Sequence, residues 1–150
     1  MALTTAAPST EFANERWADI PGWEGLYQAS DMGRVKSLPR RIPRPTHPIG
    51  DLVLKERILR YGTNKRGYRQ VSLSREGKGT SIFVHKLVAA AFFGEANGRE
   101  VNHISADKSV NTLANLEYVT HSENIAHAVD LGIWSRAAAR RDRNAKGQYV

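Results

Sequence analysis

The sequence predicts an α+β fold in which a small N-terminal β-rich module and a basic linker precede a β-hairpin, a helix and a ββα unit. Short apolar stretches occur in residues 17–38, broken by Gly and Pro, and in residues 52–84, broken by Gly, which is typical of strands joined by tight turns. Apolar residues at helical spacing follow in residues 85–93 and 121–131. With 150 residues, the chain has room for one ordinary domain, or for one small domain with appended modules.

The N-terminal part is predicted to comprise a disordered tail, residues 1–15, and a β-rich module, residues 16–38. The tail is small and polar and has no periodicity. The module begins with three aromatic residues among two glycines and a proline. Two short strands around Gly33 would place Arg34 and Lys36 on one side, because alternate residues of a strand share a face.

The middle of the chain is predicted to change from an extended linker to β structure and then to a helix. Four prolines interleave with arginines in residues 39–51, which indicates an extended linker with a basic lining. Residues 52–84 alternate apolar and polar positions, and the turn-like segment 75–79 predicts a hairpin. The helix expected at 85–93 ends at Gly94.

A ββα unit is predicted at residues 101–131. Two short apolar strands, Val101–Ile104 and Leu116–Thr120, are separated by a polar loop. The sequence Thr120–Glu123 fits a capping box at the start of the following helix, and Gly132 fits the residue just past its end.

The net charge of +7 is unevenly distributed along the chain. It is −4 in residues 1–33, +9 in residues 34–69, −2 in residues 70–131 and +4 in the basic tail, residues 132–150. Two basic segments therefore flank a nearly neutral centre, which favours a polyanionic partner because Lys and Arg release counterions from phosphates. The alternative is a basic surface that only keeps the protein in solution.

Several classes of protein are excluded by what the sequence lacks. There is no Cys, so there is no disulfide, no thiolate nucleophile and no Cys-based zinc site. A metal would have to sit on oxygen and imidazole. No apolar run approaches the roughly 20 residues that span a bilayer, and the first residues do not resemble a signal peptide. We therefore expect a soluble protein that works in a cytoplasm without a membrane partner.

Four polar residues in the ββα unit form the candidate site. Asn102 and His103 lie on the first strand, Asn115 lies just before the second, and Asn124 lies in the first turn of the helix. Because a ββα unit brings the end of its first strand beside the start of its helix, we expect Asn102, His103 and Asn124 to converge on one small pocket.

A resemblance to the HNH endonuclease family, in particular to its phage and intron-homing branch, rests on three motifs: V-N-H-I at 101–104, N-L-E-Y-V-T at 115–120 and E-N at 123–124. The stretch Val84–Phe92 is similar to that branch as well. Further upstream, Trp17–Val35 resembles a nuclease-associated modular DNA-binding motif of the NUMOD class. The order of the two matches is the order in which such modules commonly occur.

The resemblance implies an HNH nuclease domain over residues 52–131 with a ββα-metal (His-Me finger) core. His103 would be the general base, since a neutral imidazole at pH 7 can accept a proton from water. Asn115 would fix the loop between the strands and help to orient His103. Asn102 and Asn124 match the two metal-ligand positions and would offer amide oxygens to Mg²⁺ or Mn²⁺.

Position 102 departs from the commonest family pattern. Many members carry Asp before the catalytic His, where this chain has Asn102, so we expect weak metal binding until DNA supplies a phosphate. Ala128 stands where the zinc-binding bacteriocin branch has His, which argues against a structural zinc. The roles of three further residues stay open. His85 is either a core or capping residue, or it contacts the site. Asn111 is either a turn residue or part of the site, and His127 is either a flanking residue or a metal ligand.

A set of basic residues is predicted to bind DNA phosphates, with a merely solvated basic face as the alternative. The set is Arg34, Lys36, Arg40, Arg41, Arg44, Lys65, Arg66, Arg69, Arg136, Arg140 and Arg141.

The predicted function is a metal-dependent DNA endonuclease, encoded by a phage or mobile element. By resemblance it would hydrolyse one strand of double-stranded DNA per active site from the minor-groove side, in the host-cell cytoplasm and as a monomer or weak dimer. One alternative is an accessory protein that binds DNA, with phage packaging proteins as partners, and that has lost cleavage because position 102 lacks a carboxylate. A second alternative is an RNA nuclease on the same fold.

Overall fold

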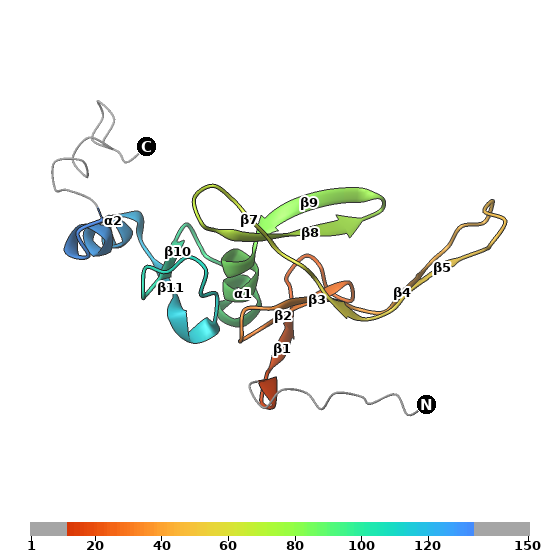
Figure 1. Cartoon of the computed structure of the whole chain (residues 1–150), viewed down its shortest axis with the longest axis horizontal. Helices are drawn as coiled ribbons and strands as arrows, with labels where there is room; N and C mark the ends of the chain where they lie inside the picture. The colour runs from red at the N-terminus through yellow and green to blue at the C-terminus, as the bar shows by residue number, and fades with distance from the viewer. Residues whose placement is uncertain (1–11, 134–150) are drawn as a thin grey trace, which may run out of the picture.

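The computed structural model describes residues 12–133. The N-terminal part of the chain forms a four-stranded antiparallel sheet in the order β1-β2-β3-β6 (Figure 1). Its strands are β1 (Trp17–Asp19), β2 (Tyr27–Ser30), β3 (Val35–Ser37) and β6 (Arg57–Ile58). The predicted pair of strands around Gly33 is therefore confirmed. Gly33 adopts φ +79° and its N–H donates to the carbonyl of Ser30, which closes the turn between β2 and β3.

The segment predicted as an unpaired linker instead begins a β-ribbon. Strand β4 (Arg40–Ile42) pairs antiparallel with β5 (Leu52–Leu54), and Figure 1 shows this ribbon projecting away from the rest of the molecule. Three prolines fall in the connecting loop, where no ladder hydrogen bond is required of them. The expectation of an extended linker over residues 39–51 is corrected accordingly: only the loop is unpaired.

The predicted hairpin and helix are both confirmed. Strands β7 (Gly62–Thr63), β8 (Arg69–Arg75) and β9 (Lys78–Phe83) form one antiparallel sheet. Glu76 and Gly77 both have positive φ angles, 52° and 77°, which is the backbone of a tight two-residue hairpin turn. Helix α1 (Val84–Phe93) follows directly and ends at Gly94, whose N–H donates to the carbonyl of Ala90.

A single hydrophobic core joins the N-terminal module to the rest of the chain. Helix α1 lies centrally in Figure 1, and it contacts β1, β2, β8, β9, β10 and β11. The core is made of Ile20, Tyr27, Ala29, Val35, Val71, Leu73, Val84, Leu87, Val88 and Leu116. Because these residues come from both sides of the ribbon, the two parts do not bury separate cores.

Tyr27 adds a polar connection between the same two parts. Its hydroxyl donates to the carbonyl of Ser74 at 3.1 Å and accepts from the N–H of Ser74 at 2.9 Å. Strand β2 is thereby fixed to strand β8 across 47 residues of sequence.

The shared core predicts that one core substitution destabilises both parts together. Leu73 is fully buried in β8, so Leu73→Ala should lower the free energy of unfolding by about 2–5 kcal/mol through lost burial and a residual cavity. Denaturant titration followed by Trp fluorescence and by far-UV circular dichroism should give one coincident transition at lower denaturant. Val53→Ala, on the ribbon and 61% exposed, is the matched control and should stay within about 0.5 kcal/mol. Two separated transitions in Leu73→Ala would contradict the single core.

Candidate active site

The ββα unit forms as the sequence predicts. Strand β10 (Glu100–His103) pairs antiparallel with β11 (Leu116–Val119), a short 3₁₀ turn (Leu113–Asn115) leads into β11, and α2 (His121–Asp130) follows. The capping box is present: the Thr120 hydroxyl accepts from the Glu123 N–H, and the Glu123 carboxylate accepts from the Thr120 N–H. These local bonds fix where α2 begins relative to the hairpin.

His103 is buried at the end of β10 and bound through one ring nitrogen. Its exposed fraction is 5%, and its Nε2 lies 3.0 Å from Oδ1 of Asn111. The Asn111 amide donates its Nδ2 to the carbonyl of Ser109, so its oxygen is the atom that faces the imidazole. Since that oxygen only accepts, Nε2 carries the proton and Nδ1 keeps the lone pair that a general base needs.

Asn115 forms its hydrogen bonds with the backbone of the loop rather than with His103. Its Oδ1 accepts from the N–H of Ser105, its Nδ2 donates to the carbonyl of Val110, and its own carbonyl accepts from the N–H of Ile104. These three bonds tie both ends of the loop between β10 and β11 to one residue. Direct contact with His103 belongs to Asn111, which the sequence alone left open as a turn residue.

The turn between β2 and β3 packs against the loop that carries Asn111. A Cβ atom built on Gly33 would lie 2.8 Å from both the carbonyl carbon and the carbonyl oxygen of Asn111. The Leu113 N–H also donates to the carbonyl of Asp31 at 2.8 Å. Asn111 itself is 3% exposed. The N-terminal module therefore fixes the position of the residue that binds His103.

His85 forms the wall behind His103. Its ring lies 5.0 Å from the His103 ring in an edge-to-face arrangement, stacks on Phe83 and lies 5.2 Å from Tyr68. Burial of the ring, together with His103 and Lys86, lowers the pKa of His85 to about 4. His85 is therefore neutral at physiological pH, and its Nδ1 is buried without a hydrogen-bond partner.

The two amide side chains of the candidate site lie on the other face of β10. Asn102 donates its Nδ2 to Oε1 of Glu117 at 2.9 Å and lies 3.2 Å from Nδ1 of His127. Asn124 donates its Nδ2 to Oε2 of Glu100 at 2.6 Å. Residues 100 and 102 share a face of β10, so both amides lie between this strand and α2.

The expected single pocket is thus divided by the strand. Asn102 and Asn124 lie together at the β10–α2 interface, whereas His103 points to the α1 side, because neighbouring side chains of a strand alternate. His127 contacts Asn102, a contact that sequence reasoning did not anticipate.

The donor set fits a hard cation better than zinc. Within residues 12–133, no three His, Cys, Asp or Glu side chains are grouped so that they could hold a metal ion. The amide oxygens of Asn102 and Asn124 are ligands that Mg²⁺ and Mn²⁺ accept, with phosphate and water completing the coordination.

A pocket of about 750 Å³ is lined by one of the two amides, Asn124, whereas Asn102 and His103 are not among its lining residues. Glu100 and Asn124 line it together with His85, and the side chains of Lys86 and Arg99 add positive charge. Its size and charge are suited to a phosphate-bearing segment of a nucleic acid strand.

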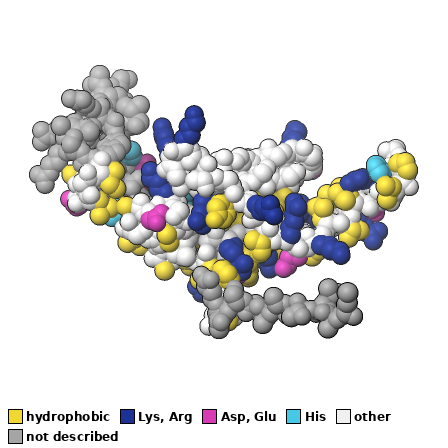
Figure 2. Space-filling view, in the orientation of Figure 1, with side chains coloured by type: hydrophobic (Ala, Val, Ile, Leu, Met, Phe, Trp, Pro, Cys, Tyr) yellow, Lys and Arg dark blue, Asp and Glu magenta, His cyan; other side chains and the backbone are white. Residues whose placement is uncertain are grey.

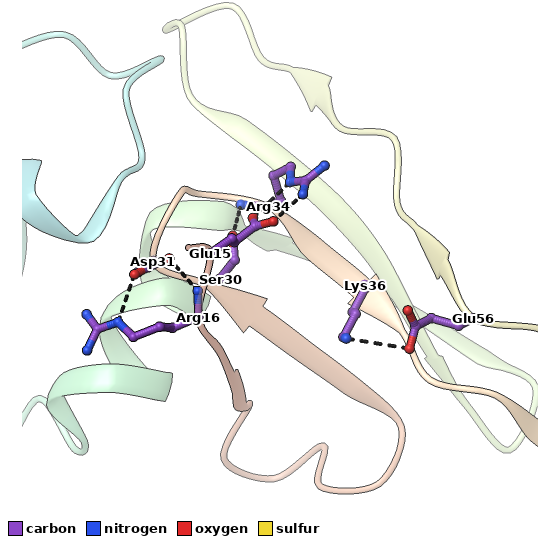
Figure 3. A network of polar contacts seen from close by, with 7 residues as sticks. All are labelled: Glu15, Arg16, Ser30, Asp31, Arg34, Lys36 and Glu56. Atoms are coloured by element: carbon purple, nitrogen blue, oxygen red, sulfur yellow. Dashed lines mark hydrogen bonds and ion pairs between the residues drawn. The ribbon is translucent and has the colours of Figure 1, made fainter. Parts of the chain in front are cut away.

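Four of the predicted DNA-binding residues, Arg34, Lys36, Arg40 and Arg41, are engaged within the protein. Figure 3 shows that Arg34 is bonded to the Glu15 carboxylate and Lys36 to Glu56, the latter pair at 3.5 Å. Both cations also lie over the ring of Trp17, which confirms that they share one side.

Arg40 is the third engaged residue, and it is bonded inside the fold rather than free for phosphate. Its guanidinium donates to the carbonyl of Leu26, to Ser37 and to the hydroxyl of Tyr27. These bonds hold Arg40 within the fold, and its role as a DNA contact stays a prediction.

Arg41 and other members of the predicted set stay accessible. Arg41 is exposed and forms an ion pair with Asp51 at 3.5 Å. Lys65 and Arg66 are exposed, Arg44 is half-buried on the ribbon loop, and Arg69 lies over the ring of Tyr61. Figure 2 shows Lys and Arg side chains spread over the centre of one face and onto the ribbon, with few Asp or Glu among them. The predicted residues outside the described part of the chain are Arg136, Arg140 and Arg141.

The part of the chain that the structure describes contains no helix long and apolar enough to cross a membrane.

Two family models match the chain in sequence. The model of the NUMOD4 motif matches residues 15–74, and that of the HNH endonuclease matches residues 83–126. The first match includes the whole N-terminal sheet and the ribbon, and the second runs from the end of β9 into α2.

Individual relatives agree with these models. The chain is 31% identical over 133 residues to the DNA endonuclease I-HmuI of Bacillus phage SP01, covering 88% of this chain and 68% of that protein. It is 35% identical over 123 residues to the HNH endonuclease L247 of Acanthamoeba polyphaga mimivirus, covering 78% of this chain and 27% of that protein. A solved structure titled as DNA binding and cleavage by the HNH homing endonuclease I-HmuI superposes with a TM-score of 0.65, over 89% of this chain and 68% of that one.

The contact between Gly33 and Asn111 predicts a position-specific glycine requirement. Gly33→Ala and Gly25→Ala both force alanine into positive φ, which costs roughly 1–2 kcal/mol, but a Cβ at position 25 meets nothing within 4 Å. Gly33→Ala should therefore destabilise the fold more than Gly25→Ala and should also shift the imidazole NMR resonances of His103. Equal loss of stability with unchanged His103 resonances would contradict the contact.

Because His85 is buried and neutral, we expect the folded protein to lose stability as the pH is lowered. The folded-state pKa is about 4 against an ordinary value of 6.5, so the unfolded chain binds more protons between these values and stability falls as pH falls through that window. The loss should be on the order of 2–3 kcal/mol. Denaturant titrations across this range should show a flatter dependence in His85→Gln, which cannot titrate. Parallel curves for the two proteins would show that His85 is not the group concerned.

Proposed function

Because this chain belongs to the HNH endonuclease family, we propose that it hydrolyses phosphodiester bonds of DNA with His103 as the general base. The observation that carries this assignment is the bond between Nε2 of His103 and Oδ1 of Asn111, which leaves Nδ1 as the proton acceptor. A buried imidazole held in one tautomer at the end of a strand is suited to remove a proton from an attacking water.

His103 and Asn111 act as a pair in this proposal. When Nδ1 takes the proton from water, the ring becomes an imidazolium, and Asn111 continues to accept from Nε2–H. Asn115 keeps the loop closed, so that Asn111 holds its distance from the ring. The neutral His85 ring beside His103 adds no competing positive charge as the imidazolium forms.

The amides of Asn102 and Asn124 are the proposed metal ligands. HNH endonucleases generally use a divalent metal ion, and we propose Mg²⁺ or Mn²⁺ for this chain because its donors are neutral oxygens. When bound, the cation supplies Lewis-acid stabilisation of the charge on the leaving oxygen.

Duplex DNA is the proposed substrate, held by the basic residues that remain accessible. The proposed phosphate contacts are Arg41 and Arg44 on the ribbon, Arg66, which lines the pocket, and the exposed Lys65 next to it in sequence. The described residues contain one ββα unit, which favours nicking of one strand per chain by a monomer or weak dimer, from the minor-groove side.

The biological setting is proposed from the relatives. A relative in a Bacillus phage and a solved homing endonuclease support a phage or mobile-element nuclease that acts in the cytoplasm of its host. Phage packaging proteins are partners only under the alternative role as an accessory protein.

The assignment of His103 predicts a large loss of cleavage on its removal. His103→Ala should slow nicking of supercoiled plasmid in Mg²⁺ or Mn²⁺ by about 10²–10⁴-fold, with DNA binding retained. His47→Ala, in the exposed loop of the ribbon, is the matched control and should leave the rate unchanged. Full nicking by His103→Ala would contradict the assignment.

The substrate class is tested in the same assay. DNA binding without nicking by the unaltered protein in any divalent metal would favour the accessory role. Competition between DNA and RNA substrates distinguishes an RNA nuclease.

A further inference from the structure

Each amide of the proposed metal site is bonded to a carboxylate through its nitrogen. Glu117 accepts from Nδ2 of Asn102 at 2.9 Å, and Glu100 accepts from Nδ2 of Asn124 at 2.6 Å. Glu100 directly precedes the V-N-H-I motif and Glu117 lies within the N-L-E-Y-V-T motif, but neither was among the predicted site residues.

Strand pairing brings the four side chains to one interface. Asn102 and Glu117 are direct partners in the antiparallel register of β10 and β11. Glu100 lies two residues before Asn102 and therefore on the same face of β10. Helix α2 packs on this hairpin and contributes Asn124 as well as His121, whose Nδ1 lies 2.7 Å from the second oxygen of Glu100.

The bonds determine which end of each amide is available to a cation. An amide whose NH₂ group donates to a carboxylate has its oxygen directed away from that carboxylate. A carboxylate on the nitrogen also draws negative charge onto the amide oxygen, which makes it a better ligand for a hard cation. Both candidate ligands have this arrangement.

The same bonds bring negative charge close to the site, although position 102 itself lacks a carboxylate. With Asn102 in place of the more common Asp, the site was expected to lack negative charge of its own. Two carboxylates lie one hydrogen bond beyond the amides instead. Hydrogen bonds with Asn124 and His121 hold the Glu100 carboxylate between β10 and α2.

We propose that Glu100 and Glu117 are positioning residues of the metal site, which orient the oxygens of Asn124 and Asn102 toward a divalent cation and supply its negative charge. This inference rests on the proposed function, in which the two Asn side chains are the ligands. It replaces the expectation that the free protein binds metal only weakly until DNA is present.

The test is the affinity of the full chain for Mn²⁺ alone, measured without DNA by electron paramagnetic resonance of the free ion and by calorimetry. Glu100→Gln and Glu117→Gln keep an oxygen that can accept from the amide but remove the charge. Each should weaken Mn²⁺ binding by about 10-fold or more. Asp130→Asn removes an exposed carboxylate at the end of α2 and should change the affinity less than 2-fold.

A charge exchange separates positioning from general damage to the fold. Asn102→Asp combined with Glu117→Gln moves the carboxylate from the supporting position to the ligand position, and it should restore the affinity that Glu117→Gln loses. Unchanged affinity in both Gln variants, no measurable Mn²⁺ binding by the unaltered chain, or no restoration in the double variant would overturn the proposal. Because nicking and His103 take no part in this measurement, its failure is distinguishable from failure of the proposed endonuclease activity.

Discussion

The docking of the β2–β3 turn onto the loop of the ββα unit is the constraint on which the arrangement of the site depends. Gly33 approaches the backbone of Asn111 so closely that no side chain fits between them, and Asp31 accepts a hydrogen bond from Leu113. Asn111 in turn fixes the tautomer of His103. A module whose relatives are DNA-binding motifs is therefore part of the support of the proposed catalytic base, and the common hydrophobic core makes the two parts one folding unit.

Strand β10 separates two kinds of chemistry by the alternation of its side chains. His103 faces α1 and a wall of aromatic rings, where burial keeps the neighbouring His85 neutral. Asn102 faces α2, where carboxylates accept from the amides. Each environment suits its residue: an apolar surrounding with one acceptor holds a neutral base in a single tautomer, and a polar interface with negative charge favours a cation.

Local signals in the sequence were sufficient for most elements, and the failures are pairings over long distances. The capping box at Thr120, the stop at Gly94 and the hairpin turn at Gly77 are all local, and all are confirmed. The ribbon was missed because prolines in its loop obscured two short strands that pair across nine residues. The ion pair between Arg34 and Glu15 and the hydrogen bonds from Arg40 to backbone carbonyls could not be found by counting charges. The roles of Asn111 and Asn115 could not be separated without the fold, because both lie in one polar loop.

The central claim is that Nε2–H of His103 donates to Oδ1 of Asn111, which leaves Nδ1 available as the base. The tautomer can be measured directly on the full chain by long-range ¹H–¹⁵N correlation NMR of selectively labelled histidine, at neutral to mildly alkaline pH and without DNA. The account predicts a protonated Nε2 and an unprotonated Nδ1 for His103, and mixed tautomers for this ring after Asn111→Ala. A protonated Nδ1 in the unaltered protein would contradict it, because that ring could not accept a proton from water at the atom that faces away from Asn111.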